Sequence, residues 1–91
     1  MVTRYPTAVQ ARVRLDSESN ELRLTVVTNT GRVLDEWVVY GTTTWDTTAR
    51  AQVETHLERA GLRFAPFEGG PRHGWHARVA PLAVDPDAAT D

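Results

Sequence analysis

The sequence contains no cysteine, no lysine and no isoleucine. Without cysteine the chain has no disulfide, no thiolate nucleophile and no thiolate metal ligand, and without lysine it has no Schiff base and no catalytic amine. All ten residues counted as lysine or arginine are therefore arginine. Arginine without lysine, and valine without isoleucine, is typical of a high-GC coding style. A single arginine in this chain is thus weaker evidence for a selected guanidinium group than it would be elsewhere.

Long apolar runs are also missing. No stretch approaches the roughly 18–20 residues that a membrane-spanning helix needs, and residues 1–6 show no apolar core of a signal peptide. We expect no membrane association, and a bacterial cytoplasmic location.

The chain is short and nearly neutral. Its 91 residues predict one α+β domain over residues 1–83 and a disordered acidic tail over residues 84–91. Three of the twelve acids lie in that tail, so residues 1–83 hold ten arginines against nine acids, a net charge of +1. A chain of this size buries only roughly 60–65% of its unfolded surface. Since no disulfide supplements the small core, a homodimer is a natural expectation.

Three segments alternate with a period of two residues, which predicts half-buried strands. They cover residues 8–15, 21–28 and 32–40, and Asn29-Thr30-Gly31 between the last two is typical of a hairpin turn. Extended apolar residues at 62–67 and alternation at 75–79 predict further strand, separated by a glycine-rich loop at 68–74.

One helix follows the third strand. Asp46 is a good N-cap residue, and Gly61 suits the left-handed position that ends a helix. Apolar residues recur between them on one stripe, at Ala49, Val53, Leu57 and Ala60. The element order β-β-β-α-β(-β) predicts an antiparallel sheet of four or five strands with one amphipathic helix on one face. The opposite face is then left open.

The register of the third strand decides which residues share that open face. If Thr28 pairs with Arg32 across a three-residue turn, then Leu34, Val38 and Tyr40 join the core, and Trp37 lies on the open face. A shift by one residue inverts this assignment.

The open face is the leading candidate site for a partner. In the preferred register it carries arginines beside an aromatic ring, and we expect a partner to bind there, at Arg12, Arg14, Arg23 and Trp37. The same surface suits nucleic acid, with bases stacked on Trp37 and phosphates bound by Arg12, Arg14, Arg23, Arg72 and Arg78. The near-neutral charge argues against that alternative.

The signals for catalysis are weak. His73 and His76 have a spacing that metal sites use, but no second pair of ligands follows. The adjacent acids Asp35 and Glu36 point to opposite faces of a strand and cannot act as a carboxylate dyad. We therefore expect no cofactor and no enzyme; a metal-dependent or hydrolytic enzyme using His73 and His76 is a distant third reading. The sequence favours a small accessory or regulatory binding module, whose partner is a protein or a second copy of the chain, with nucleic acid as the alternative.

Overall fold

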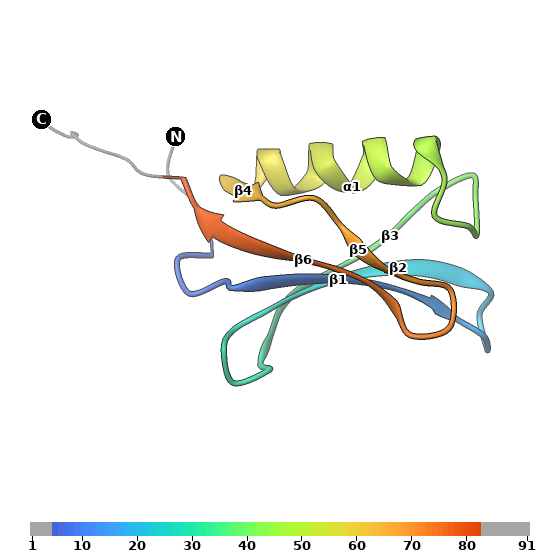
Figure 1. Cartoon of the computed structure of the whole chain (residues 1–91), viewed down its shortest axis with the longest axis horizontal. Helices are drawn as coiled ribbons and strands as arrows, with labels where there is room; N and C mark the ends of the chain where they lie inside the picture. The colour runs from blue at the N-terminus through green and yellow to red at the C-terminus, as the bar shows by residue number, and fades with distance from the viewer. Residues whose placement is uncertain (1–4, 83–91) are drawn as a thin grey trace, which may run out of the picture.

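The computed structural model describes residues 5–82 and confirms the predicted α+β class, with an antiparallel sheet and one helix (Figure 1). The predicted tail at 84–91 lies outside the described residues. The elements in chain order are β1 (Gln10–Asp16), β2 (Glu21–Val27), β3 (Val33–Val38), α1 (Thr47–Arg59), β4 (Leu62–Phe64), β5 (Glu68–Gly70) and β6 (Gly74–Pro81).

The strands lie in the order β3-β2-β1-β6-β4, and β5 also pairs with β6. Every pairing is antiparallel. The helix therefore connects β3 at one edge to β4 at the other, and it lies over one face of the sheet (Figure 1). No helix formed by residues 5–82 has the length and apolar character needed to span a bilayer.

Residues 62–70 supply two short strands, so the sheet has six strands where four or five were expected. The prediction of a loop at 68–74 is partly wrong. Residues 68–70 form β5, in which Gly69 pairs with Trp75 of β6. Gly69 has a φ of +122°, and a Cβ there would lie 2.2 Å from the carbonyl oxygen of Gly74. Glycine thus permits the close backbone approach on which this pairing depends.

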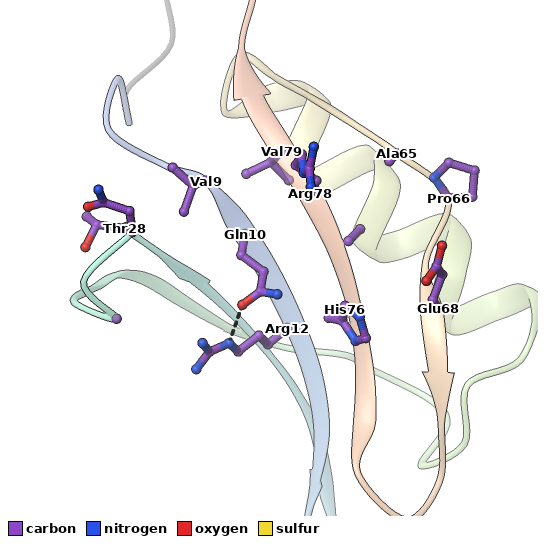
Figure 2. A pocket seen from close by; sticks show the side chains of 13 residues that line it. Val9, Gln10, Arg12, Thr28, Ala65, Pro66, Glu68, His76, Arg78 and Val79 are labelled. Atoms are coloured by element: carbon purple, nitrogen blue, oxygen red, sulfur yellow. Dashed lines mark hydrogen bonds between the residues drawn. The ribbon is translucent and has the colours of Figure 1, made fainter.

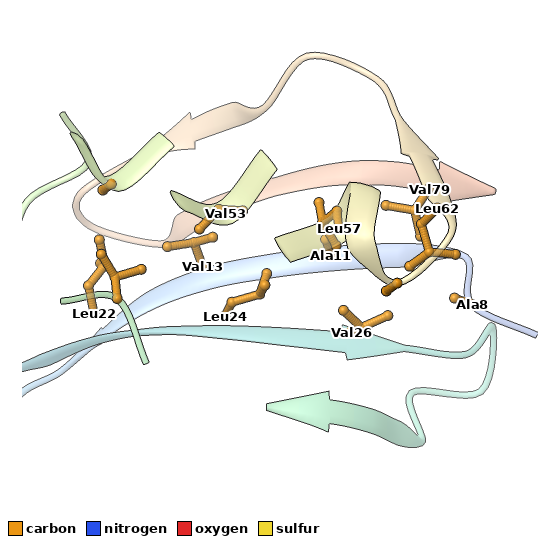
Figure 3. Packing of buried hydrophobic residues seen from close by; sticks show 13 residues of the cluster. Ala8, Ala11, Val13, Leu22, Leu24, Val26, Val53, Leu57, Leu62 and Val79 are labelled. Atoms are coloured by element: carbon orange, nitrogen blue, oxygen red, sulfur yellow. The ribbon is translucent and has the colours of Figure 1, made fainter. Parts of the chain in front are cut away.

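The helix begins and ends as predicted. The carboxylate of Asp46 accepts a hydrogen bond from the N–H of Ala49 at 2.9 Å, and Gly61 follows the helix with a φ of +77°. On the helix, Ala49, Val53 and Leu57 are buried. They pack against the apolar faces of β1 and β2 to form the core (Figure 3). Its fully buried larger side chains are Leu22, Leu24, Leu57, Leu62, Val13, Val26 and Val53.

Two tryptophans extend this core at one end. Trp45 and Trp75 pack against it while remaining partly exposed, and their rings stack with centroids 5.8 Å apart.

The turn between β2 and β3 also forms as predicted: the N–H of Thr28 donates to the carbonyl of Arg32 at 2.9 Å. Beyond the turn the register differs. Val27 pairs with Val33, whereas Val26 pairs with Asp35, so β3 contains one extra residue at this point. This is a β-bulge.

The bulge makes part of the predicted face assignment wrong. Leu34 packs against the core as expected, but every later residue of β3 is inverted. Trp37 pairs with a helix-facing residue of β2, and Val39 is buried. Val38 instead lies opposite Arg23 on the open side, and Tyr40 is 70% exposed.

Candidate binding face

The sheet face that points away from α1, called the open face below, carries most of the predicted site residues. In β1, Ala11 and Val13 are fully buried toward the helix, so the residues that alternate with them point the other way. The strand pairings then place Arg12, Arg14, Arg23, His76 and Arg78 together on the open face.

One row of side chains crosses the whole open face. Pairing partners define it, from edge to edge, as Glu68, His76, Arg12, Thr25 and Glu36. Acids stand at both ends of the row and basic groups in its middle. The positive charge of the face is therefore concentrated along β1 and β6.

Arg23 has two acids of its own beside it. Its Nη2 lies 3.0 Å from Oε1 of Glu21 and 3.7 Å from Oδ2 of Asp16. Hydrogen bonds from the N–H of Glu18 and the side chain of Ser19 hold the pKa of Asp16 below its usual range, so Asp16 stays ionised beside this guanidinium. These two acids therefore compete with any partner for Arg23.

Arg12, Arg14 and Arg78 differ from Arg23 because none forms an ion pair with a carboxylate of residues 5–82. Arg12 donates from Nε to the neutral amide oxygen of Gln10 at 2.7 Å. Three exposed guanidinium groups on two adjacent strands thus have no counter-charge among the residues that the structure describes.

A shallow depression of about 820 Å3 occupies the same face (Figure 2). Side chains of β1 and β6, among them Arg12, His76 and Arg78, form its floor. The hairpin turn at 28–31 lines one side, and the segment from Ala65 to Glu68 lines the other. The open face is thus hollowed where its free arginines lie.

The remaining predicted residues lie in the turn between β5 and β6 or on β6 itself. Arg72 lies in the exposed turn between β5 and β6 and does not line the depression. His73 lies in the same turn and His76 on β6. Within the described part of the chain, no three histidine, aspartate or glutamate side chains are grouped so that they could hold a metal ion.

Trp37 is not on the open face, which corrects its predicted position. Its ring stacks on that of His56 in the helix, with centroids 4.9 Å apart and 20° between the planes. Nε2 of His56 lies 2.7 Å from Oδ2 of Asp35, and both of these side chains are about four-fifths buried. Sequence reasoning missed this cluster. The signal for it is Asp35 itself, since an acid on the helix-facing side of a strand needs a polar partner from the helix.

A groove of about 360 Å3 lies beside this cluster, lined by Trp37, Ala51, Gln52, Thr55, His56 and Arg59. Gln52 closes one end: its amide donates to the carbonyl of Tyr40 at 2.6 Å and accepts from the N–H of Tyr40 at 3.0 Å. These hydrogen bonds connect the segment just after β3 to the helix.

Comparison of the chain with known protein families, with curated proteins and with solved structures found no match, so its function is inferred from the geometry of the open face.

Proposed function

We propose that this protein is a small, non-enzymatic binding module, accessory or regulatory in role, that holds an acidic segment of a partner protein on its open face. The observation that carries the proposal is the set of three guanidinium groups, on Arg12, Arg14 and Arg78, which have no counter-charge among residues 5–82 and share their face with a depression. Charge complementarity of this kind selects partners and speeds their association.

The pairing of β1 with β2 supports this role. Arg14 lies directly opposite Arg23, and like charges at such a position destabilise a sheet. Arg23 has two acids of its own, whereas Arg14 has none among residues 5–82. A carboxylate supplied by a partner would offset a repulsion that the free protein leaves in place.

The position of Trp37 bears on the choice of partner. With Trp37 facing the helix, as Trp75 and Phe64 also do, the described strands offer no indole or phenyl ring on the open face for bases to stack on. Single-stranded nucleic acid binding relies on such rings together with a positively charged groove. A protein segment that presents carboxylates needs only the charges and the depression.

Self-association through the open face is less favoured. A two-fold interface brings the same patch of each copy together, so the positively charged face of one copy would meet the positively charged face of the other. We therefore propose a different protein as the partner, and a cytoplasmic setting for the encounter.

The proposal is tested with two probes of equal charge, a twelve-residue polyglutamate peptide and a single-stranded DNA of mixed sequence, by fluorescence anisotropy at low salt. We expect the peptide to bind, and the double variant Arg14→Gln/Arg78→Gln to weaken binding about tenfold or more, since charged hydrogen bonds are lost. The control Arg50→Gln/Arg59→Gln removes the same charge from the helix and should bind like the unchanged protein. Equal losses of peptide affinity in both double variants would contradict the proposal. Tighter binding of the DNA than of the peptide would indicate that the face binds nucleic acid.

A further inference from the structure

A small basic pocket lies at the end of the open face near the turn between β5 and β6. Its volume is about 210 Å3, and it is lined by Gln10, Arg12, Arg14, His73, Trp75 and His76. Four of these six side chains are arginine or histidine, and none is an acid. The larger depression beside it, by contrast, includes Glu68 in its lining.

The two arginines of the pocket are positioned by their neighbours. Arg12 uses Nε to bond the amide oxygen of Gln10 at 2.7 Å, so that bond leaves both terminal nitrogens of the guanidinium available. The stem of Arg14 crosses Gly74, where a Cβ would lie only 2.8 Å from Cγ of Arg14. Gly74 has a φ of +84°, so the turn both requires a glycine and leaves room for the arginine.

The histidines come from the two ends of the turn. His76 is the pairing partner of Arg12 across β1 and β6, which places the two side chains next to each other on the same face. His73 precedes β6 and reaches the pocket from the turn. On the other side of His76 lies its pairing partner Glu68, which does not line the pocket.

The chemistry of these donors favours a tetrahedral oxyanion. Arginine binds carboxylate and phosphate groups through two parallel N–H bonds, and phosphates attract clusters of arginine in particular. A phosphate monoester has three strong acceptor oxygens and a charge near −2, which matches two guanidinium groups and two imidazoles. A carboxylate offers two oxygens and one charge, and so uses only part of the set.

We infer that this pocket binds a phosphate monoester. The inference rests on the proposed function, because it assigns the group that the open face recognises: a phosphorylated serine or threonine in the partner segment, or else a small phosphorylated molecule. A phosphate in the pocket would contact Arg12 and Arg14 while the rest of an extended segment follows the depression toward Arg78.

The experiment compares four probes by NMR titration of the 15N-labelled chain: a seven-residue peptide with a central phosphoserine, the same peptide with aspartate there, the same peptide with unmodified serine, and inorganic phosphate. We expect the phosphopeptide to bind at least about tenfold more tightly than the aspartate peptide, because more charged hydrogen bonds form. The backbone amides of residues 73–76 and 12–14 should shift most. Arg12→Gln/Arg14→Gln should remove this preference, and Arg50→Gln/Arg59→Gln should retain it.

The outcomes separate the sources and the hypotheses. A phosphopeptide that binds more tightly than inorganic phosphate supports a phosphorylated protein partner, and equal affinities support a small phosphorylated ligand. If the aspartate peptide and the phosphopeptide bind equally well, and the arginine variant loses both, the phosphate inference is overturned while the acidic-segment function stands. If no probe binds, or if the arginine variant binds as the unchanged protein does, both fail.

Discussion

The two faces of the sheet are built from the same strands, yet they carry opposite kinds of side chain. On β2, Leu24 is 1% exposed beneath the helix, and the next residue, Thr25, points to the open face. On β1 the same contrast separates fully buried Val13 from exposed Arg14. The helix side is filled by packing, whereas the open side carries arginines that form no ion pair within the described part of the chain. Stability and recognition are thus divided between neighbouring residues of one strand.

The largest expected effect on stability comes from a substitution in the core beneath the helix. Leu24→Ala should lower the free energy of unfolding by about 2–5 kcal/mol, because a fully buried leucine leaves a cavity that the core only partly fills. Chemical denaturation with urea, followed by tryptophan fluorescence, measures this difference.

The matched control for Leu24→Ala is Thr25→Ala, one residue along the same strand on the open face. Thr25 is half-buried on an inner strand, so this substitution is expected to lower the free energy of unfolding by about 1 kcal/mol or less. Similar losses at both positions would mean that the open face is also packed, and the division between the two faces would be wrong.

Trp37 also tests the difference between the two faces, because the sequence predicted it on the open face and it lies on the helix side. Because its ring stacks on His56 and packs against the core, Trp37→Ala should lower the free energy of unfolding by about 1–3 kcal/mol, less than a fully buried aromatic would. The affinity for the acidic peptide should not change. A Trp37→Ala variant that has normal stability but no longer binds the peptide would instead support a position of Trp37 on the open face.

Most of the fold was accessible from sequence because each element has a local cause. Alternation predicted β1, β2 and β6, and the Asp46 cap and Gly61 predicted the ends of the helix. These signals arise within a few residues of the chain. They do not depend on which strand lies beside which.

The bulge in β3 has no such local cause. Residues 33–38 read as one alternating strand, and the extra residue becomes visible only when β3 is aligned against β2. What makes the inverted register favourable is the bond between Asp35 and His56, 21 positions apart, and the stacking of Trp37 on the same imidazole. An apolar pattern cannot report that polar contact. The arginines of β1 were placed correctly because β1 pairs without interruption, and the error on Trp37 is confined to the strand with the bulge.

The helix that covers the packed face depends on pH through its cap. Hydrogen bonds from the N–H of Ala49 and the hydroxyl of Thr42 hold the pKa of Asp46 below its usual range. A carboxyl group whose pKa is lowered by folding stabilises the folded state above its unfolded pKa of about 3.9, and this contribution is lost as the pH falls through the folded pKa.

Asp46→Asn keeps a capping side chain without the titrating charge. We expect this variant to melt at a lower temperature than the unchanged protein at pH 7, by less than Trp37→Ala does, and the difference should shrink below about pH 4 as the carboxyl is protonated. Melting curves followed by circular dichroism from pH 7 to pH 2.5 measure it. A difference that stays constant over that range would exclude the carboxylate as its cause.

The smallest expected effect has the opposite sign and belongs to the open face. Arg14 lies opposite Arg23, so Arg14→Glu should replace a repulsion by an attraction and raise the free energy of unfolding by about 0.2–1 kcal/mol. Arg14→Gln removes only the repulsion and should give a smaller gain, and 1 M salt should reduce both gains by screening. The same Arg14→Glu change should abolish binding of the acidic peptide. A chain that becomes more stable while losing its partner would show that this arginine is kept at a cost to stability, as residues of a binding site often are. A loss of stability would mean instead that Arg14 helps to hold the sheet, and the case for a free charge at this position would fail.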